Sequence, residues 1–126
     1  MSKIFKVGLI GCGHISETYF RAQEYFNNIR IVKCADINMG AAKRCAIHYN
    51  IEAVTVEELL KDKEIEIILN LTIPGAHYEV SKMALENGKH SYAEKPMAVN
   101  FEDGKKLVEL AKEKNLYIGN APDTFL

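Results

Sequence analysis

Short apolar segments alternate with amphipathic segments along the whole chain, and this alternation restricts the possible folds more than any other feature. Runs of apolar and β-branched residues between turn residues predict strands at 4–10, 29–35, 51–54, 64–72, 89–93 and 116–119. Helical periodicity predicts helices between them, as in Ile15, Tyr19 and Phe26 after the first strand. Strands that alternate with helices form right-handed crossovers and a parallel sheet. We therefore expect an α/β fold, with a doubly wound parallel sheet of about six strands and helices on both faces.

Several residues predict where individual helices begin and end. Asn38 is a suitable N-cap for a helix that runs to Tyr49, and Thr55 with Glu58 matches a capping box. Gly88 is a natural C-cap for the helix that follows the fourth strand, and Asn100 is expected to cap the last long helix. The sequence contains no recognisable linker or internal repeat between the predicted elements, so we expect one domain over residues 1–126.

Composition excludes several classes of function. The net charge is -1 at pH 7, which gives no basic footprint for a nucleic acid backbone. No apolar run reaches the length of a membrane span, so no membrane partner is expected. Cys12, Cys34 and Cys45 lack metal-ligand spacing in the sequence, which predicts free thiols in a reducing cytoplasm and no metal site.

The segment between the first strand and the first helix contains a glycine pattern. In a dinucleotide-binding turn the first glycine permits the tight turn, the second lets phosphates approach the backbone, and the third position is small. Gly11, Gly13 and Ser16 meet these needs. The pyrophosphate would then face the N-terminus of a helix that starts near His14, where unpaired N–H groups favour an anion. The alternative is a purely structural turn. Together with the alternating elements, the pattern predicts a Rossmann-type sheet.

An acidic residue, Asp36, closes the second predicted strand. Its carboxylate is placed to accept hydrogen bonds from the adenosine ribose hydroxyls. A 2′-phosphate about 4 Å away would be repelled by about 4 kcal/mol at an effective dielectric near 20, which favours NAD over NADP. Lys43 and Arg44 lie one turn into the next helix and leave NADP possible. The alternative role of Asp36 is that of a turn or cap residue.

Lys95 follows the fifth predicted strand. Ligands of open α/β sheets bind beyond the carboxyl ends of the strands, so Lys95 would project into the same crevice as the glycine turn. Its ammonium would hydrogen-bond a substrate hydroxyl or carbonyl and stabilise charge during hydride transfer, which makes Lys95 the candidate catalytic residue. The alternative is a solvated lysine before a loop proline.

The combination of "VGLIGCGHIS", Asp36 and "TIPGAHYEVSKMALENGKHSYAEKP" resembles the N-terminal half of the Gfo/Idh/MocA oxidoreductases. The resemblance covers essentially all 126 residues. It implies a cofactor-binding set of Gly11, Gly13, His14, Ile15, Asp36, Thr72, Ile73, Pro74, His77, Glu94, Lys95 and Asn120. Within that set, Glu94 and Lys95 would lie by the nicotinamide ribose and ring. For His77 a structural alternative stays open, since it could satisfy a buried backbone group or cap a helix.

The resemblance also implies what the full protein does. Such enzymes are NAD(P)-dependent oxidoreductases that act on CH–OH groups, here a sugar or polyol as small-molecule substrate. Their second domain, C-terminal to the first, supplies most of the substrate pocket and the oligomer interface, and residues 1–126 do not contain it. The chain ends on Phe125 and Leu126 without a polar tail, so we expect a piece of a longer, homo-oligomeric protein that is inactive in isolation.

Two other classes of protein remain as alternatives. A non-catalytic NAD(H)-sensing module would use the same cofactor residues and would have no chemistry for Lys95. A methyltransferase also opens with a glycine turn and an acid after the second strand, but Ile15 stands where its third glycine would be.

Overall fold

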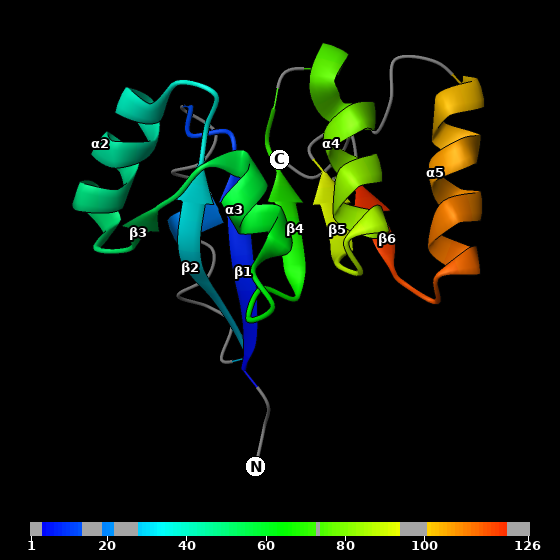
Figure 1. Cartoon of the computed structure of the whole chain (residues 1–126), viewed down its shortest axis with the longest axis horizontal. Helices are drawn as coiled ribbons and strands as arrows, with labels where there is room; N and C mark the ends of the chain where they lie inside the picture. Colours follow the sequence, from blue (N-terminus) through cyan, green and yellow to red (C-terminus); the bar gives the residue numbers. More distant parts are fainter. Residues whose placement is uncertain (1–3, 14–18, 22–27, 73, 94–100, 121–126) are drawn as a thin grey trace.

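The computed structural model describes residues 4–13, 19–21, 28–72, 74–93 and 101–120 (Figure 1). Residues 19–21 are helical. The remaining elements are β1 (Phe5–Ile10), β2 (Ile29–Ala35), α2 (Met39–Tyr49), β3 (Glu52–Ala53), α3 (Val56–Lys61), β4 (Ile67–Asn70), α4 (Pro74–Glu86), β5 (His90–Ala93), α5 (Phe101–Glu113) and β6 (Ile118–Asn120). Among the described residues, no helix combines the length and the apolar character needed to cross a membrane.

The strands form one sheet in the order β3-β2-β1-β4-β5-β6, and every neighbouring pair is parallel. The chain builds one half of the sheet outward from β1 and the other half outward from β4. This is the doubly wound Rossmann order, which confirms the expected fold class. The connections from β1 and from β4 leave in opposite directions along the sheet, which makes the carboxyl ends of these two strands the expected place for a ligand.

Both faces of the sheet are buried. Leu9, Cys34 and Leu69 face one side, where Cys45 and Ala46 of α2 pack against them. Ile10, Ala35 and Ile68 alternate with them and face the other side, where α3 and α4 contribute leucine, valine and alanine side chains. Figure 1 shows α3 and α4 in front of the sheet, with α5 at the side of α4. Burial on two faces explains why β1 and β4 are mainly apolar in sequence, with the exposed Lys6 and the buried Asn70 as exceptions.

The helix boundaries agree with the local signals. The Asn38 side chain accepts a hydrogen bond from the Ala41 N–H at 3.2 Å, and α2 ends at Tyr49 as expected. Thr55 and Glu58 form both hydrogen bonds of the capping box. Gly88 has a φ of 76°, the left-handed conformation of a helix C-cap. Asn100 lies outside the described residues.

The fourth strand differs from its expected limits. It is shorter than 64–72, because the chain first turns and the buried ammonium of Lys89 closes that turn: its Nζ donates to the carbonyls of Asp62 at 2.5 Å and Ile65 at 2.7 Å. The apolar residues of α5 are only partly buried. Leu107 and Ala111 contact Leu85 of α4, whereas Val108 is 41% exposed.

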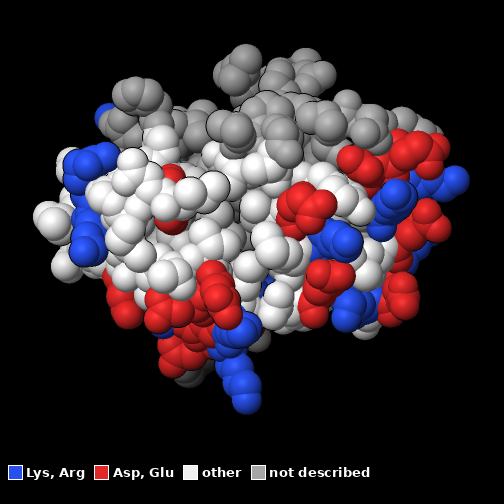
Figure 2. Space-filling view, turned by 45° about the horizontal axis from the view of Figure 1, so that its top comes forward, with Lys and Arg blue, Asp and Glu red and all other residues white. Residues whose placement is uncertain are grey.

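Acidic and basic side chains are interspersed on the surface. Figure 2 shows Lys and Arg next to Asp and Glu on the face in view, around a largely uncharged area. This distribution agrees with the net charge of -1 and is not the single-sign patch that holds a polyanion.

Candidate functional site

The register of the sheet brings the predicted site residues to one edge. Ala35, Ile10, Asn70, Ala93 and Asn120 form a single row across five strands through successive parallel pairs. Four of the predicted residues that the structure describes are on this row or follow it by one or two positions in sequence, which puts them at the carboxyl end of the sheet: Gly11, Asp36, Thr72 and Asn120. Strands lie about 4.8 Å apart, so β2 and β5 are separated by about 14 Å. An extended ligand, not a compact one, would contact the ends of both β2 and β5.

The glycine turn begins with a position that only glycine can occupy. Gly11 has a φ of 102°, a conformation that side chains rarely adopt. A Cβ there would lie 2.7 Å from the carbonyl carbon and oxygen of Leu71, which follows β4. The Gly11 N–H donates to the Ala35 carbonyl at 2.9 Å. The turn is thereby held between the ends of β2 and β4, at the point where the order of the strands reverses.

Gly13 has no such folding requirement. Apart from its chain neighbours, no atom of the described residues lies within 4 Å of a Cβ built on Gly13, and its φ is outside the left-handed region. Gly13 is also exposed, so an alanine would fit without strain in the described structure. The absence of a side chain at this position therefore leaves open space above the backbone of the turn, which is what a phosphate needs to approach the N–H groups.

Asp36 connects the glycine turn to the end of β2. One carboxylate oxygen accepts the Cys12 N–H at 2.7 Å, and the other accepts the Asn38 N–H at 2.9 Å. A carboxylate offers about four lone-pair positions, so these two bonds leave room for two hydroxyl donors. The side chain is half-buried. Asp36 thus fills the structural role of a turn residue. It also keeps lone pairs that could accept ribose hydroxyls, so the two alternatives left open by the sequence are compatible.

Ile37 is a residue that sequence reasoning missed. It follows Asp36 and is 93% exposed, next to the lone pairs that would hold a ribose. An apolar side chain in water at this position is suited to cover one face of a planar base. The signal was an isoleucine in a turn otherwise made of polar residues. The guanidinium of Arg44 lies near the start of α2, because its Nη1 is 3.5 Å from the position that a Cβ would take at Gly40.

A buried polar network fixes the loop after β4. Asn70 is fully buried; its Oδ1 accepts the Thr72 hydroxyl at 2.6 Å, and its Nδ2 donates to the Ser81 Oγ at 2.9 Å and to the His77 carbonyl at 3.0 Å. Ser91 extends the network to β5, with its Oγ 3.2 Å from that of Ser81. The network orients Thr72 and ties α4 to β4. Asn70 was not predicted, although an asparagine inside an apolar strand was a visible signal.

His77 is 1% exposed on α4. This burial agrees with the structural alternative that the sequence left open for His77. Pro74 begins α4 and Asn120 ends β6, both at the carboxyl edge of the sheet. His14, Ile15, Ile73, Glu94 and Lys95 lie outside the described residues; Glu94 and Lys95 directly follow Ala93 of β5 in the sequence.

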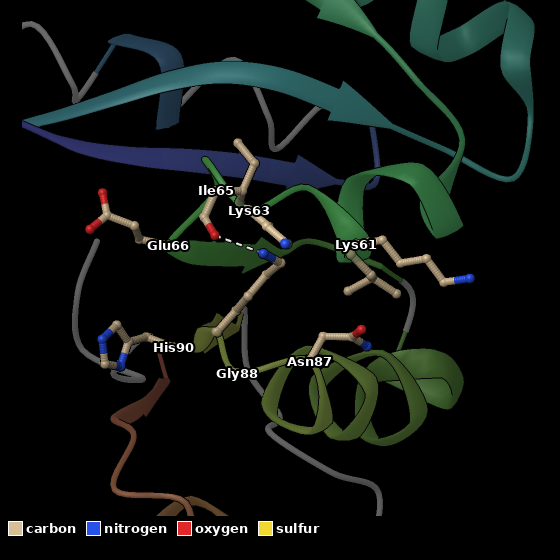
Figure 3. Close-up of a pocket in the computed structure, with 9 residues that line it drawn as sticks. Lys61, Lys63, Ile65, Glu66, Asn87, Gly88 and His90 are labelled. Atoms are coloured by element: carbon tan, nitrogen blue, oxygen red, sulfur yellow. Dashed lines mark hydrogen bonds between the residues drawn. The ribbon is translucent and has the colours of Figure 1, made fainter.

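A pocket of about 530 Å³ lies at the opposite, amino end of β4 and β5 (Figure 3). Lys61, Lys63, Glu66 and His90 are among its lining residues. Lys89 also lines the pocket, and its ammonium donates to the carbonyls of Asp62 and Ile65. Figure 3 labels Ile65 and marks its hydrogen bond with a dashed line. Since open α/β sheets bind ligands at their carboxyl ends, this pocket is a structural feature of the α3–β4 turn.

The strand order, the glycine turn and the acid after β2 define a dinucleotide-binding domain of the Rossmann class. Residues 5–121 match the GFO_IDH_MocA family model, described as an oxidoreductase family with an NAD-binding Rossmann fold. The chain belongs to this family of oxidoreductases, as its sequence motifs indicated.

Similar proteins include dehydrogenases and a reductase. Inositol 2-dehydrogenase of Salmonella typhimurium is 31% identical over 114 residues, which are 87% of this chain and 34% of that protein. Trans-1,2-dihydrobenzene-1,2-diol dehydrogenase of Xenopus tropicalis is 31% identical over 120 residues, 92% of this chain and 36% of its own length. A 3-ketoreductase structure from Actinomadura kijaniata, in complex with NADP and TDP-benzene, has a TM-score of 0.88 at 26% identity and covers 94% of this chain and 37% of that one. The chain spans about a third of the length of these relatives.

Proposed function

We propose that the chain is the coenzyme-binding domain of an NAD-dependent dehydrogenase, and that the full protein transfers hydride between a nicotinamide and a sugar or polyol hydroxyl. The observation that carries this proposal is the open space at Gly13, beside a turn that Gly11 and Asp36 hold at the switch point of the sheet. The relatives named as inositol and dihydrodiol dehydrogenases support the substrate class. Family membership favours this interpretation over a methyltransferase.

The residues of this chain would bind and orient the coenzyme. Because the N–H groups of Gly11 and Cys12 already donate to Ala35 and Asp36, backbone N–H groups from Gly13 to Ile15 would hold the pyrophosphate. Asp36 would accept the ribose hydroxyls with its remaining lone pairs. Bound NAD supplies a hydride acceptor at the nicotinamide. Lys95 would hydrogen-bond the substrate oxygen and hold its proton as charge develops. Thr72, Ile73, Pro74, His77, Glu94 and Asn120 complete the proposed coenzyme-binding set.

We propose NAD rather than NADP as the coenzyme because the Asp36 carboxylate, if it holds the ribose, would repel a 2′-phosphate. Arg44 favours NADP instead, since its guanidinium lies near the start of α2 and would attract that phosphate. We place the full protein in the cytoplasm, as a homo-oligomer, with substrate-positioning groups on a C-terminal domain.

A sensing module is the competing function, and Lys95 separates the two. Lys95→Met in the full-length protein keeps the length of the side chain and removes its charge. A dehydrogenase should lose kcat by about 100-fold or more, the usual contribution of a proton-transfer group, and should keep its affinity for NADH within about twofold. A full-length protein whose kcat is unchanged by this substitution would contradict the catalytic role of Lys95.

A further inference from the structure

Three cysteines from separate elements converge under the glycine turn. Cys12 belongs to the turn, Cys34 to β2 and Cys45 to α2, and their sulfur atoms all lie within 4.8 Å of one another. Cys34 is fully buried, Cys45 is 8% exposed, and Cys12 is half-buried. Their positions in the sequence predicted separate thiols and no metal site, so this juxtaposition appears only in the folded chain.

The sheet register and the packing of α2 explain the convergence. Cys34 pairs with Leu9 across β1 and β2 and faces the side of the sheet that α2 covers. Cys45 lies on the buried face of α2, beside Ala46. The Cys12 side chain points back toward β2, where its thiol donates to the Ala35 carbonyl at 3.5 Å. The three sulfur atoms are therefore brought together by strand pairing and by the apolar packing of α2 on the sheet.

The spacing of the sulfurs suits a tetrahedral thiolate site. Zn–S bonds of about 2.3 Å put neighbouring sulfurs about 3.8 Å apart in a tetrahedron. The present separations of at most 4.8 Å need adjustments of about 1 Å, which side-chain rotation can supply. Three thiolates with a divalent ion carry a charge of about -1, against about -2 with a monovalent ion, so burial favours the divalent ion.

We propose that Cys12, Cys34 and Cys45 form a binding site for a thiophilic divalent metal ion, such as Zn²⁺ or Cd²⁺, and that its occupation weakens dinucleotide binding at the turn above it. Binding releases three protons to solvent and forms three metal–sulfur bonds, with a fourth coordination position left open. The ion draws Cys12 toward β2 and leaves a negative site beneath the pyrophosphate. The weakening of dinucleotide binding rests on the proposed coenzyme function, whereas the metal site itself does not.

The test uses reduced, metal-free protein titrated with CdCl₂ while thiolate-to-cadmium charge transfer is followed in the ultraviolet. We expect a band that saturates at one ion per chain, with release of about three protons. Cys34→Ser and Cys45→Ser should each weaken Cd²⁺ binding by at least about tenfold, with circular dichroism showing that they remain folded. His48→Ala is the matched control, because His48 is exposed on the same helix and should leave the titration unchanged. Absence of the band in the wild type, or an unchanged titration in folded serine variants, would overturn the site.

A second readout separates the site from the coenzyme function. With one Cd²⁺ per chain, the dissociation constant of NADH should rise about fivefold or more, and NADH should weaken Cd²⁺ binding by the same factor. If the band forms and the NADH constant does not change, the metal site stands and the coupling is refuted. If NADH fails to bind the metal-free protein, the proposed function fails and the cadmium band still decides the metal site.

Discussion

Gly13→Ala separates folding from coenzyme binding more sharply than any other substitution in the turn. Apart from its chain neighbours, the added Cβ meets no atom of the described residues within 4 Å, and the backbone is outside the left-handed region. Alanine also restricts the unfolded chain more than glycine does, which stabilises a folded protein by about 0.4–1 kcal/mol where the native backbone tolerates it. The free energy of unfolding of this variant should therefore be unchanged or slightly higher.

The same methyl group would occupy the space through which we expect the pyrophosphate to approach the turn. A hydrogen bond between a backbone N–H and a charged oxygen contributes about 1.5–3 kcal/mol. Displacing the phosphate far enough to lose one such bond weakens NADH binding about 10- to 150-fold, since each 1.4 kcal/mol is a factor of about ten. Stability and affinity should thus move in opposite directions.

The assay pairs a denaturant melt with a fluorescence titration of NADH. Gly11→Ala is the contrasting control: at a φ of 102°, with a Cβ 2.7 Å from the Leu71 carbonyl, it should lower the free energy of unfolding by at least about 2 kcal/mol. A Gly13→Ala variant that is as stable as the wild type and binds NADH within twofold of it would refute the placement of the pyrophosphate.

Three further substitutions test other parts of the account. Asp36→Asn should raise the affinity for NADPH relative to NADH by about tenfold or more, because it removes the charge that repels a 2′-phosphate; an unchanged ratio in paired titrations would contradict the role of Asp36. The pKa of Asp62 is lowered below its usual 3.8, chiefly by its hydrogen bond from the Lys33 ammonium, so its stabilisation is present above pH 3.8 and is lost as the pH falls through the lowered value. The stability difference between wild type and Asp62→Asn should accordingly shrink below pH 3.8 in acid melts, and a constant difference would argue against the pair. Lys89→Met should cost about 2–4 kcal/mol because the buried carbonyl of Ile65 and the half-buried carbonyl of Asp62 lose their donor, whereas Lys63→Met, on the same pocket, should change the free energy of unfolding by less than about 0.5 kcal/mol.

Features encoded within a few residues were predictable from the sequence. The caps at Asn38 and Thr55 depend on side chains that bond backbone groups three positions away, and α2 has its expected end at Tyr49. β2 also has its expected limits, 29–35. The alternation of strands and helices determined the doubly wound sheet, because parallel strands need helical crossovers on both faces.

Features that depend on contacts between distant segments were not predictable. The fourth strand is shortened by the ammonium of Lys89, which comes from beyond the next helix. The three thiols meet only because β1, β2 and α2 pack together. The alignment of Ala35, Ile10 and Asn70 across neighbouring strands likewise follows from strand pairing rather than from local propensity. The sequence identified the residues around the glycine turn and Asp36, but not the hydrogen bond that joins Cys12 to Asp36.

The most direct test of the central claim is a calorimetric titration of the folded protein with NADH, alongside S-adenosylmethionine. We predict saturable binding of one NADH per chain with a dissociation constant well below millimolar, and no heat of binding from S-adenosylmethionine. A protein that melts cooperatively yet takes up no NADH or NAD at millimolar concentration would contradict the assignment of the turn at Gly11 and Gly13 to a dinucleotide.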